Sequence, residues 1–177
     1  MTVARITCAA VAGLTSLIAL PGAAAALSCL QPDPVRHYMD ARDAPERYMA
    51  VLGRFTSSEP LAQPAPAPVP PPGASGFPRD GIAITEGVRF QGRALDQDGF
   101  DLPVDRPVSV ALRCLGQFCA TSLAQGEVIA YLKQTTTAPR AEVDPCGGWF
   151  YENPSPAQID AVLRCHTEGD CVTGTGR

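Results

Sequence analysis

Cysteine is the residue type that offers the most chemistry in this chain of 177 residues. Cys8 lies in an apolar N-terminal segment, and six more follow: Cys29, Cys114, Cys119, Cys146, Cys165 and Cys171. Cysteines of this kind form disulfides, hold zinc or carry out redox exchange. The short zinc knuckle and the thioredoxin-like site both place two residues between their cysteines, and no pair here has that spacing. Disulfides are therefore the favoured interpretation, and the alternative is a zinc site built from Cys114, Cys119, Cys165, His166 and Cys171.

The pairing of six cysteines is not determined by their positions, because six permit fifteen connectivities. We expect Cys114 to pair with Cys119 across a tight loop and Cys165 with Cys171 at the end of a helix. The remaining pair, Cys29 with Cys146, would tie the N-terminal segment to the rest of the domain. Because it closes a loop of more than a hundred residues, the chain-entropy model gives it a stabilisation of roughly 4 to 5 kcal/mol.

Catalytic motifs are absent from the sequence. It contains no H-E-x-x-H, no G-x-S-x-G and no phosphate-binding glycine loop, and its two histidines, His37 and His166, lie far apart. Glu142, Asp144 and Asp160 could form an acid pair, but their spacing does not require it. We therefore predict no catalytic, cofactor or metal residue. An enzyme whose site is assembled only by folding is the alternative.

The first 26 residues have the pattern of a signal peptide. Arg5 precedes an apolar run over 6–20, Pro21-Gly22 breaks it, and small residues at 23–26 suit a peptidase that cleaves after Ala26. The apolar run is shorter than the ~20 residues that span a bilayer. A lipid-modified Cys29 is a further alternative, because the residues before it loosely imitate a lipoprotein motif. The pattern predicts export to the periplasm or the extracellular space, where disulfides persist.

Charge and composition narrow the class of partner. The net charge is -4, and the arginines are scattered instead of forming a basic stripe, so nucleic-acid binding is not expected. Residues 57–80 are rich in proline and alanine, which predicts an extended loop between strands. A stiff solvated spacer is the favoured reading of this loop, and a docking segment for an aromatic groove is the alternative. The glycine- and threonine-rich tail, 172–177, is predicted to be disordered.

Hydrophobic periodicity predicts a mainly β domain over residues 27–171 with a helix near each end. Alternation indicates strands at 47–55, 82–95, 106–114, 126–134 and 141–144, the second with a bulge at Glu86-Gly87. Asp33 and Pro34 begin one helix, and Ser155 and Pro156 begin the other. Residues 96–101 carry three aspartates and a glycine, which favours a hairpin turn over a calcium loop. Five strands of this size suit a small closed barrel.

Residues 119–149 carry a resemblance to a known family. Cys119, Leu123, Gly126, the pair Tyr131-Leu132 and then Cys146 are similar in order to the signature of netrin-like modules, to which the tissue inhibitors of metalloproteinases belong. The resemblance implies a five-stranded OB barrel with flanking helices. In the inhibitors of that family an N-terminal cysteine contacts the zinc of the target enzyme, and here Cys29 would be the third residue after cleavage.

The resulting expectation is an exported, disulfide-stapled binding module of netrin-like type with an OB-like barrel. Its ligand is a protein or a small molecule, and its partner-binding edge is Ser28, Cys29 and Leu30. The alternative within the family is a metalloprotease inhibitor acting through the Cys29 edge, and the alternative outside it is the small enzyme.

Overall fold

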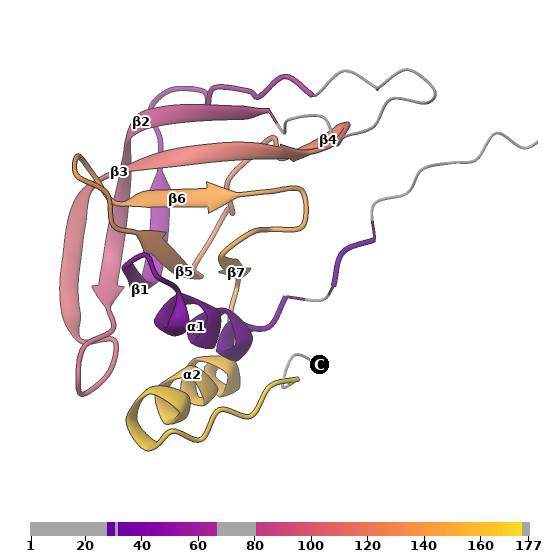
Figure 1. The fold of residues 1–177 in the computed structure, drawn as a ribbon. Helices are drawn as coiled ribbons and strands as arrows, with labels where there is room; N and C mark the ends of the chain where they lie inside the picture. The colour runs from indigo at the N-terminus through magenta and orange to yellow at the C-terminus, as the bar shows by residue number, and fades with distance from the viewer. Residues whose placement is uncertain (1–27, 31, 67–80, 175–177) are drawn as a thin grey trace, which may run out of the picture.

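The computed structural model describes residues 28–30, 32–66 and 81–174, and the predicted signal peptide lies outside these residues. The chain is mainly β with two helices, α1 and α2, that lie together beside the sheet (Figure 1). In chain order the elements are α1 (Pro34–Asp43), β1 (Tyr48–Thr56), β2 (Ile82–Ala94), β3 (Leu102–Leu115), β4 (Phe118–Cys119), β5 (Val128–Lys133), β6 (Arg140–Val143), β7 (Phe150–Glu152) and α2 (Pro156–Glu168).

Five strands close into a barrel in the order β1-β2-β3-β6-β5, and β5 pairs again with β1. All of these pairs are antiparallel except β3 with β6, which run parallel. The contact between β5 and β6 is a single bridge between Lys133 and Arg140. Two short strands extend the sheet, β4 beside β3 and β7 beside β5. The predicted five-stranded OB-like barrel is confirmed.

Strand β5 separates two apolar layers. Val128, Ala130 and Leu132 point into the barrel core, whereas Ile129 and Tyr131 point into a second cluster with the helices. All five side chains are buried, because the outer face of β5 is covered as well as the inner one. The outer face is covered by Val35 of α1 and by Ala161, Val162 and Cys165 of α2. This two-layer arrangement brings α1 against the barrel and so positions the clefts described below.

The helix starts follow the sequence expectation. Asp33 accepts hydrogen bonds from the amides of Val35 and Arg36 at 2.9 and 3.0 Å, and Pro34 occupies the first turn. Ser155 and Gln158 form a reciprocal capping box at the start of α2. The bulge is also confirmed, because the register of β2 against β3 shifts between Thr85 and Val88.

Three elements differ from the sequence prediction. Strand β3 begins at Leu102, not at 106, and strands β4 and β7 were not predicted. Proline discourages a strand assignment, and β3 carries Pro103 and Pro107. Both prolines precede Ser109, where pairing with β6 begins, so this half of β3 has a neighbour on one side only and tolerates a missing amide.

The first part of the proline-rich loop lies against the barrel. The amide of Ala62 donates to Thr85 Oγ1 at 2.8 Å, Leu61 packs on the core and Pro64 is buried. The expectation of a solvated spacer is therefore corrected at Leu61 and Pro64, whose apolar side chains lie against the barrel, whereas the other described residues from 57 to 66 are exposed. The rest of the loop, 67–80, lies outside the described residues.

Three disulfides join the predicted pairs: Cys29–Cys146, Cys114–Cys119 and Cys165–Cys171. Disulfides in this number are typical of an oxidising compartment. The zinc alternative is wrong, because the four cysteines it needs are consumed in two of these bridges. The sulfur that a lipid anchor at Cys29 would use is likewise bonded to Cys146. No helix among the described residues is long and apolar enough to cross a membrane.

Candidate functional site

The predicted edge, Ser28 to Leu30, is held on the molecule by a covalent bond. The disulfide from Cys29 to Cys146 joins residues 117 positions apart and brings their Cα atoms to 5.4 Å. Ser28, Cys29 and Leu30 are all exposed, and the Leu30 side chain is 92% accessible. Leu30 is therefore a large apolar side chain that is open to solvent and directly follows a covalent tether.

The turn that carries Cys146 has a defined shape. Asp144 Oδ1 accepts from the amides of Cys146 at 2.7 Å and Gly148 at 3.1 Å. Gly147 and Gly148 have φ values of 95° and 65°, in the region that favours glycine. A Cβ on Gly148 would lie 2.6 Å from the carbonyl oxygen of Glu142. This turn therefore orients both Cys146 and the following Trp149.

The edge, the turn and one face of α1 together line a cleft of about 530 Å³. We call it the edge cleft. Its residues include Ser28, Cys29, Leu30, Asp33, His37 and Trp149. The volume lies within the range of roughly 300 to 1,000 Å³ that is usual for ligand pockets. All three residues of the predicted edge thus meet at one hollow in the surface.

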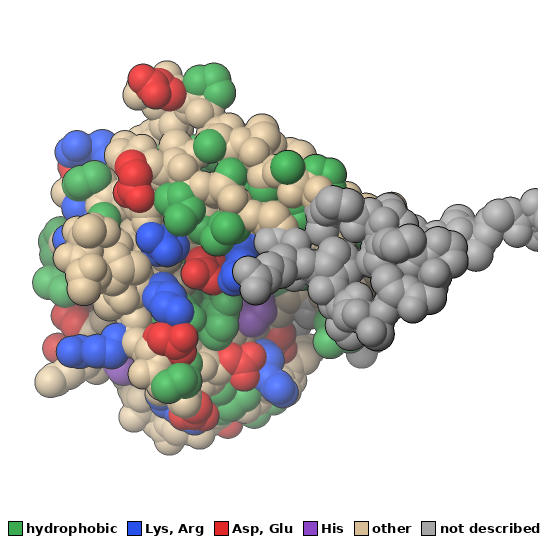
Figure 2. Space-filling model, turned by 45° about the horizontal axis from the view of Figure 1, so that its top comes forward, with side chains coloured by type: hydrophobic (Ala, Val, Ile, Leu, Met, Phe, Trp, Pro, Cys, Tyr) green, Lys and Arg blue, Asp and Glu red, His purple; other side chains and the backbone are tan. Residues whose placement is uncertain are grey.

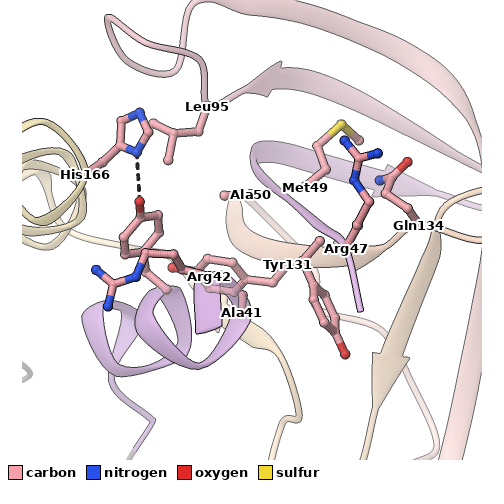
Figure 3. Close-up of a pocket in the computed structure, with 11 residues that line it drawn as sticks. Ala41, Arg42, Arg47, Met49, Ala50, Leu95, Tyr131, Gln134 and His166 are labelled. Atoms are coloured by element: carbon pink, nitrogen blue, oxygen red, sulfur yellow. Dashed lines mark hydrogen bonds between the residues drawn. The ribbon is translucent and has the colours of Figure 1, made fainter. Parts of the chain in front are cut away.

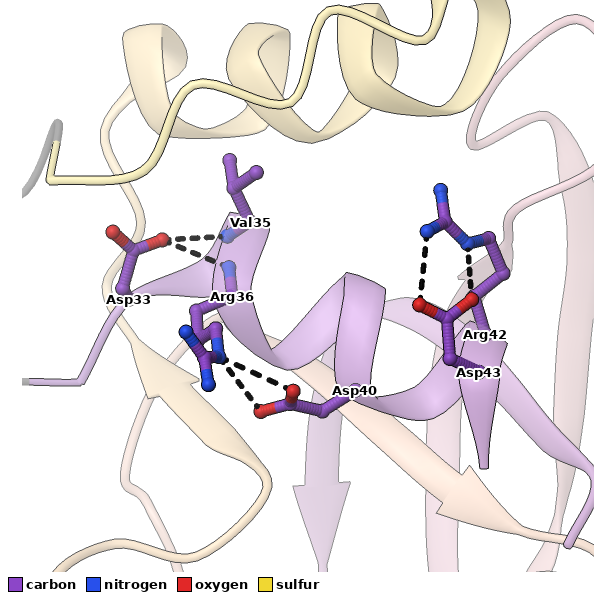
Figure 4. A network of polar contacts seen from close by, with 6 residues as sticks. All are labelled: Asp33, Val35, Arg36, Asp40, Arg42 and Asp43. Carbon is purple, nitrogen blue, oxygen red and sulfur yellow. Dashed lines mark hydrogen bonds and ion pairs between the residues drawn. The ribbon is translucent and has the colours of Figure 1, made fainter. Parts of the chain in front are cut away.

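Acidic groups dominate the edge cleft. Asp33, Asp40 and Asp144 line it, against one arginine, Arg36. Arg36 pairs with Asp40 at 3.2 Å on α1 (Figure 4). Among the described residues Asp33 and Asp144 form no ion pair, and the hydrogen bonds to their carboxylates come from neutral backbone amides. Two uncompensated negative charges therefore face the cleft.

Aromatic rings form one side of the edge cleft. His37 lies 6.0 Å from Trp149 between ring centroids, and Trp149 stacks on Tyr48 at 4.8 Å. Burial lowers the pKa of His37 below its usual value, although Asp40, Asp33 and Asp144 act in the opposite direction. His37 Nδ1 is buried without a hydrogen-bond partner in the part of the chain that the structure describes. His37 is thus neutral near pH 7 and leaves the charge of the cleft negative.

Sequence reasoning missed several residues of this cleft. No role was assigned to His37, and Asp33 was recognised only as a helix cap. The one signal in the sequence was the glycine pair at 147 and 148, just before Trp149, because glycine suits the positive φ angles of this turn. The other acidic candidates are not brought together: Glu142 pairs with Arg113 at 3.0 Å, while Asp144 shapes the turn.

The hairpin expected at residues 96–101 is present between β2 and β3. Asp96 Oδ1 accepts from the amides of Asp98 and Gly99 at 3.1 and 3.2 Å, which uses this carboxylate inside the turn. No cluster of three or more His, Cys, Asp or Glu side chains within the described ranges is arranged to hold a metal ion. On the face that Figure 2 presents, acidic and basic side chains are interspersed.

With the fold and the edge cleft described, the chain can be compared with known proteins. Comparisons with protein-family models, with curated proteins and with solved structures find no match to this chain.

Proposed function

We propose that the protein is exported and acts as a disulfide-stabilised binding module of netrin-like type, which takes a segment of a protein partner into the edge cleft. The observation that carries this proposal is the Cys29–Cys146 bridge, which fixes the exposed Leu30 beside an acidic hollow. The signal-peptide pattern of residues 1–26 and the three disulfides support export.

The chemistry of the edge cleft selects the kind of segment. Among the described residues the carboxylates of Asp33 and Asp144 have no basic partner, so they favour a lysine or arginine side chain, whose charge they would compensate. Leu30 and Trp149 offer apolar and aromatic area to the residue next to it. A basic residue flanked by an apolar one is therefore the expected recognition pattern.

Selection from a random peptide library on the immobilised native protein tests this proposal. The informative variant is Asp33→Asn with Asp144→Asn, because asparagine keeps an oxygen acceptor for the helix cap and for the turn while removing both charges. A charge-matched control is Asp98→Asn with Asp160→Asn, which lie outside the edge cleft. Basic peptides that bind the native and control proteins but not the first variant would support the proposal. Peptides that bind all three equally, or no selected peptide, would refute it.

Inhibition of a zinc protease remains the alternative use of the same edge. It requires the chain to begin near Cys29, so it predicts that native protein slows a metalloprotease and that residues added ahead of Leu27 abolish the effect. Intact mass before and after reduction reports the cleavage site and the number of bridges. A chain that keeps residues 1–26 outside the cytoplasm, or a panel without inhibition, would exclude this mechanism.

A further inference from the structure

A second cleft lies against a different face of helix α1. It has a volume of about 570 Å³ and lies between α1, the start of β1 and α2. Tyr38 and Arg42 come from α1, Arg47 and Ala50 from the start of β1 and the residue before it, and His166 from α2. We call it the arginine cleft (Figure 3).

The charge of the arginine cleft is positive. Among the residues that the structure describes, no acidic one lines it, whereas Arg42 and Arg47 both do. The neighbouring acids are engaged elsewhere: Asp43 pairs with Arg42 at 2.7 Å and Glu46 with Lys133 at 2.9 Å. Arg47 forms no ion pair with any described residue. Its guanidinium lies beside the amide end of Gln134 and across the cleft from His166 (Figure 3).

One wall of the cleft is held by hydrogen bonds. His166 Nε2 lies 2.7 Å from the carbonyl oxygen of Asp96, which can only accept, so Nε2 must donate. Nδ1 is then the acceptor in the neutral ring, and the Tyr38 hydroxyl donates a hydrogen bond to it at 2.8 Å. Because both ring nitrogens form hydrogen bonds, the His166 ring is held in place as one wall of the cleft.

The floor of the arginine cleft is apolar. Ala41, Ala50, Leu95 and Met49 line it together with the ring of Tyr131. The Tyr131 hydroxyl donates to the carbonyl of Pro34 at 2.6 Å and so is not available to a ligand. Sites that combine an apolar surface with a few placed polar groups are typical of small-molecule binding.

From this arrangement we propose that the arginine cleft binds a small organic monocarboxylate. The carboxylate pairs with the guanidinium of Arg47, which presents a planar fork of donors that matches it. The apolar part of the ligand covers Ala50 and Leu95. A single negative charge fits a cleft with a single unpaired cation, whereas a dianion would keep one charge uncompensated. This site is separate from the edge cleft and does not depend on the function proposed for it.

Calorimetric titration with hexanoate tests the proposal, with hexanol and hexylammonium as probes of the same apolar length and acetate as the probe without it. Hexanoate should bind the native protein and the other three should bind at least about tenfold more weakly, since each lacks the charge or the apolar contact. Equal binding of hexanol and hexanoate, or no binding of hexanoate, would overturn it.

Arg47→Gln should weaken hexanoate at least about tenfold. Arg54→Gln is the matched control, because Arg54 is an exposed arginine within β1, forms no ion pair within the described residues and does not line the cleft. An equal loss in both variants would show non-specific attraction and refute the site. Should Arg47→Gln fail to fold, amide chemical shifts of the native protein decide: hexanoate should move Arg47, Ala50 and Gln134 but not Leu30, and the reverse pattern would refute the proposal.

Discussion

The edge cleft and the arginine cleft have similar volumes, about 530 and 570 Å³, yet their charges are opposite. Each is lined by an arginine of α1 that forms an ion pair within the helix: Arg36 pairs with Asp40, which also lines the edge cleft, and Arg42 pairs with Asp43, which lies outside the arginine cleft (Figure 4). The opposite charges within each pair cancel, so the pairs contribute little to the electrostatic potential of either cleft. The difference comes from the groups left over, which are Asp33 and Asp144 in one cleft and Arg47 in the other.

The comparison also shows how one helix serves two sites. Asp33, Arg36, His37 and Asp40 lie on one face of α1, and Tyr38, Ala41 and Arg42 lie on another. Positions three and four apart share a face of a helix, so the two sets alternate in sequence but separate in space. Tyr131 stands between them, since it lines the arginine cleft and its ring lies 6.4 Å from those of His37 and Trp149.

The largest expected effect is the loss of the long disulfide, whose two cysteines line the edge cleft and not the arginine cleft. Cys29→Ser with Cys146→Ser should lower the free energy of unfolding by about 4 to 5 kcal/mol in the chain-entropy model. Cys114→Ser with Cys119→Ser, which opens a loop of 5 positions, should lower it by about 2 kcal/mol. Urea unfolding without reductant measures both. An equal loss in the two variants would contradict the expected weight of the long bridge.

The turn after Asp144 gives the next effect. Gly148→Ala should destabilise the protein by about 2 to 3 kcal/mol, because alanine disfavours a φ of 65° and its Cβ would crowd the Glu142 carbonyl. Gly116→Ala is the control, since Gly116 has a φ of 62° but open space around its Cβ. Thermal unfolding should separate the two variants. If Gly116→Ala lowered the unfolding temperature as much as Gly148→Ala, the backbone angle alone would explain the loss of stability, and crowding against the Glu142 carbonyl would not contribute.

Tyr131→Phe tests the wall between the two clefts. Removing the hydroxyl deletes the buried hydrogen bond to the Pro34 carbonyl at 2.6 Å, which should cost about 1 kcal/mol of stability. Because this bond holds the start of α1 on the barrel, peptide binding in the edge cleft and hexanoate binding in the arginine cleft should both weaken. An effect on one cleft only would show that Tyr131 does not couple them.

The smallest expected effect is a pH dependence that arises in the edge cleft. Burial lowers the pKa of His37 in the folded protein, so the unfolded chain takes up a proton more readily as the pH falls. His37 therefore leaves stability unaffected above about pH 6.5 and reduces it progressively below that value. His37→Gln should show a smaller loss of stability between pH 7.5 and 5 than the native protein, as measured by urea midpoints at both pH values. His166 is present in both proteins and cancels from the difference, and identical pH profiles would contradict this account.

Much of the fold follows from short-range patterns. Asp33-Pro34 and Ser155-Pro156 specify helix starts because a cap and its amides lie within three residues. Alternation along 128–133 indicates a strand, and the Glu86-Gly87 break marks the bulge. The disulfide pairs were predicted as well, two of them across short spacings and the third, Cys29 with Cys146, as a tie between the N-terminal segment and the rest of the domain.

The sequence by itself therefore determined the helices, the five main strands and the two short disulfides, since each rests on neighbours a few positions apart, whereas the bridge from Cys29 to Cys146 spans 117 positions. Only the tertiary structure decided that β3 begins at Leu102, that the loop residue Pro64 is buried and that both faces of β5 are covered. It alone brought His37 to Trp149 and left Arg47 without an acidic partner among the described residues. Such contacts join residues more than a hundred positions apart, and whether a charge is paired depends on barrel closure, which no local pattern records.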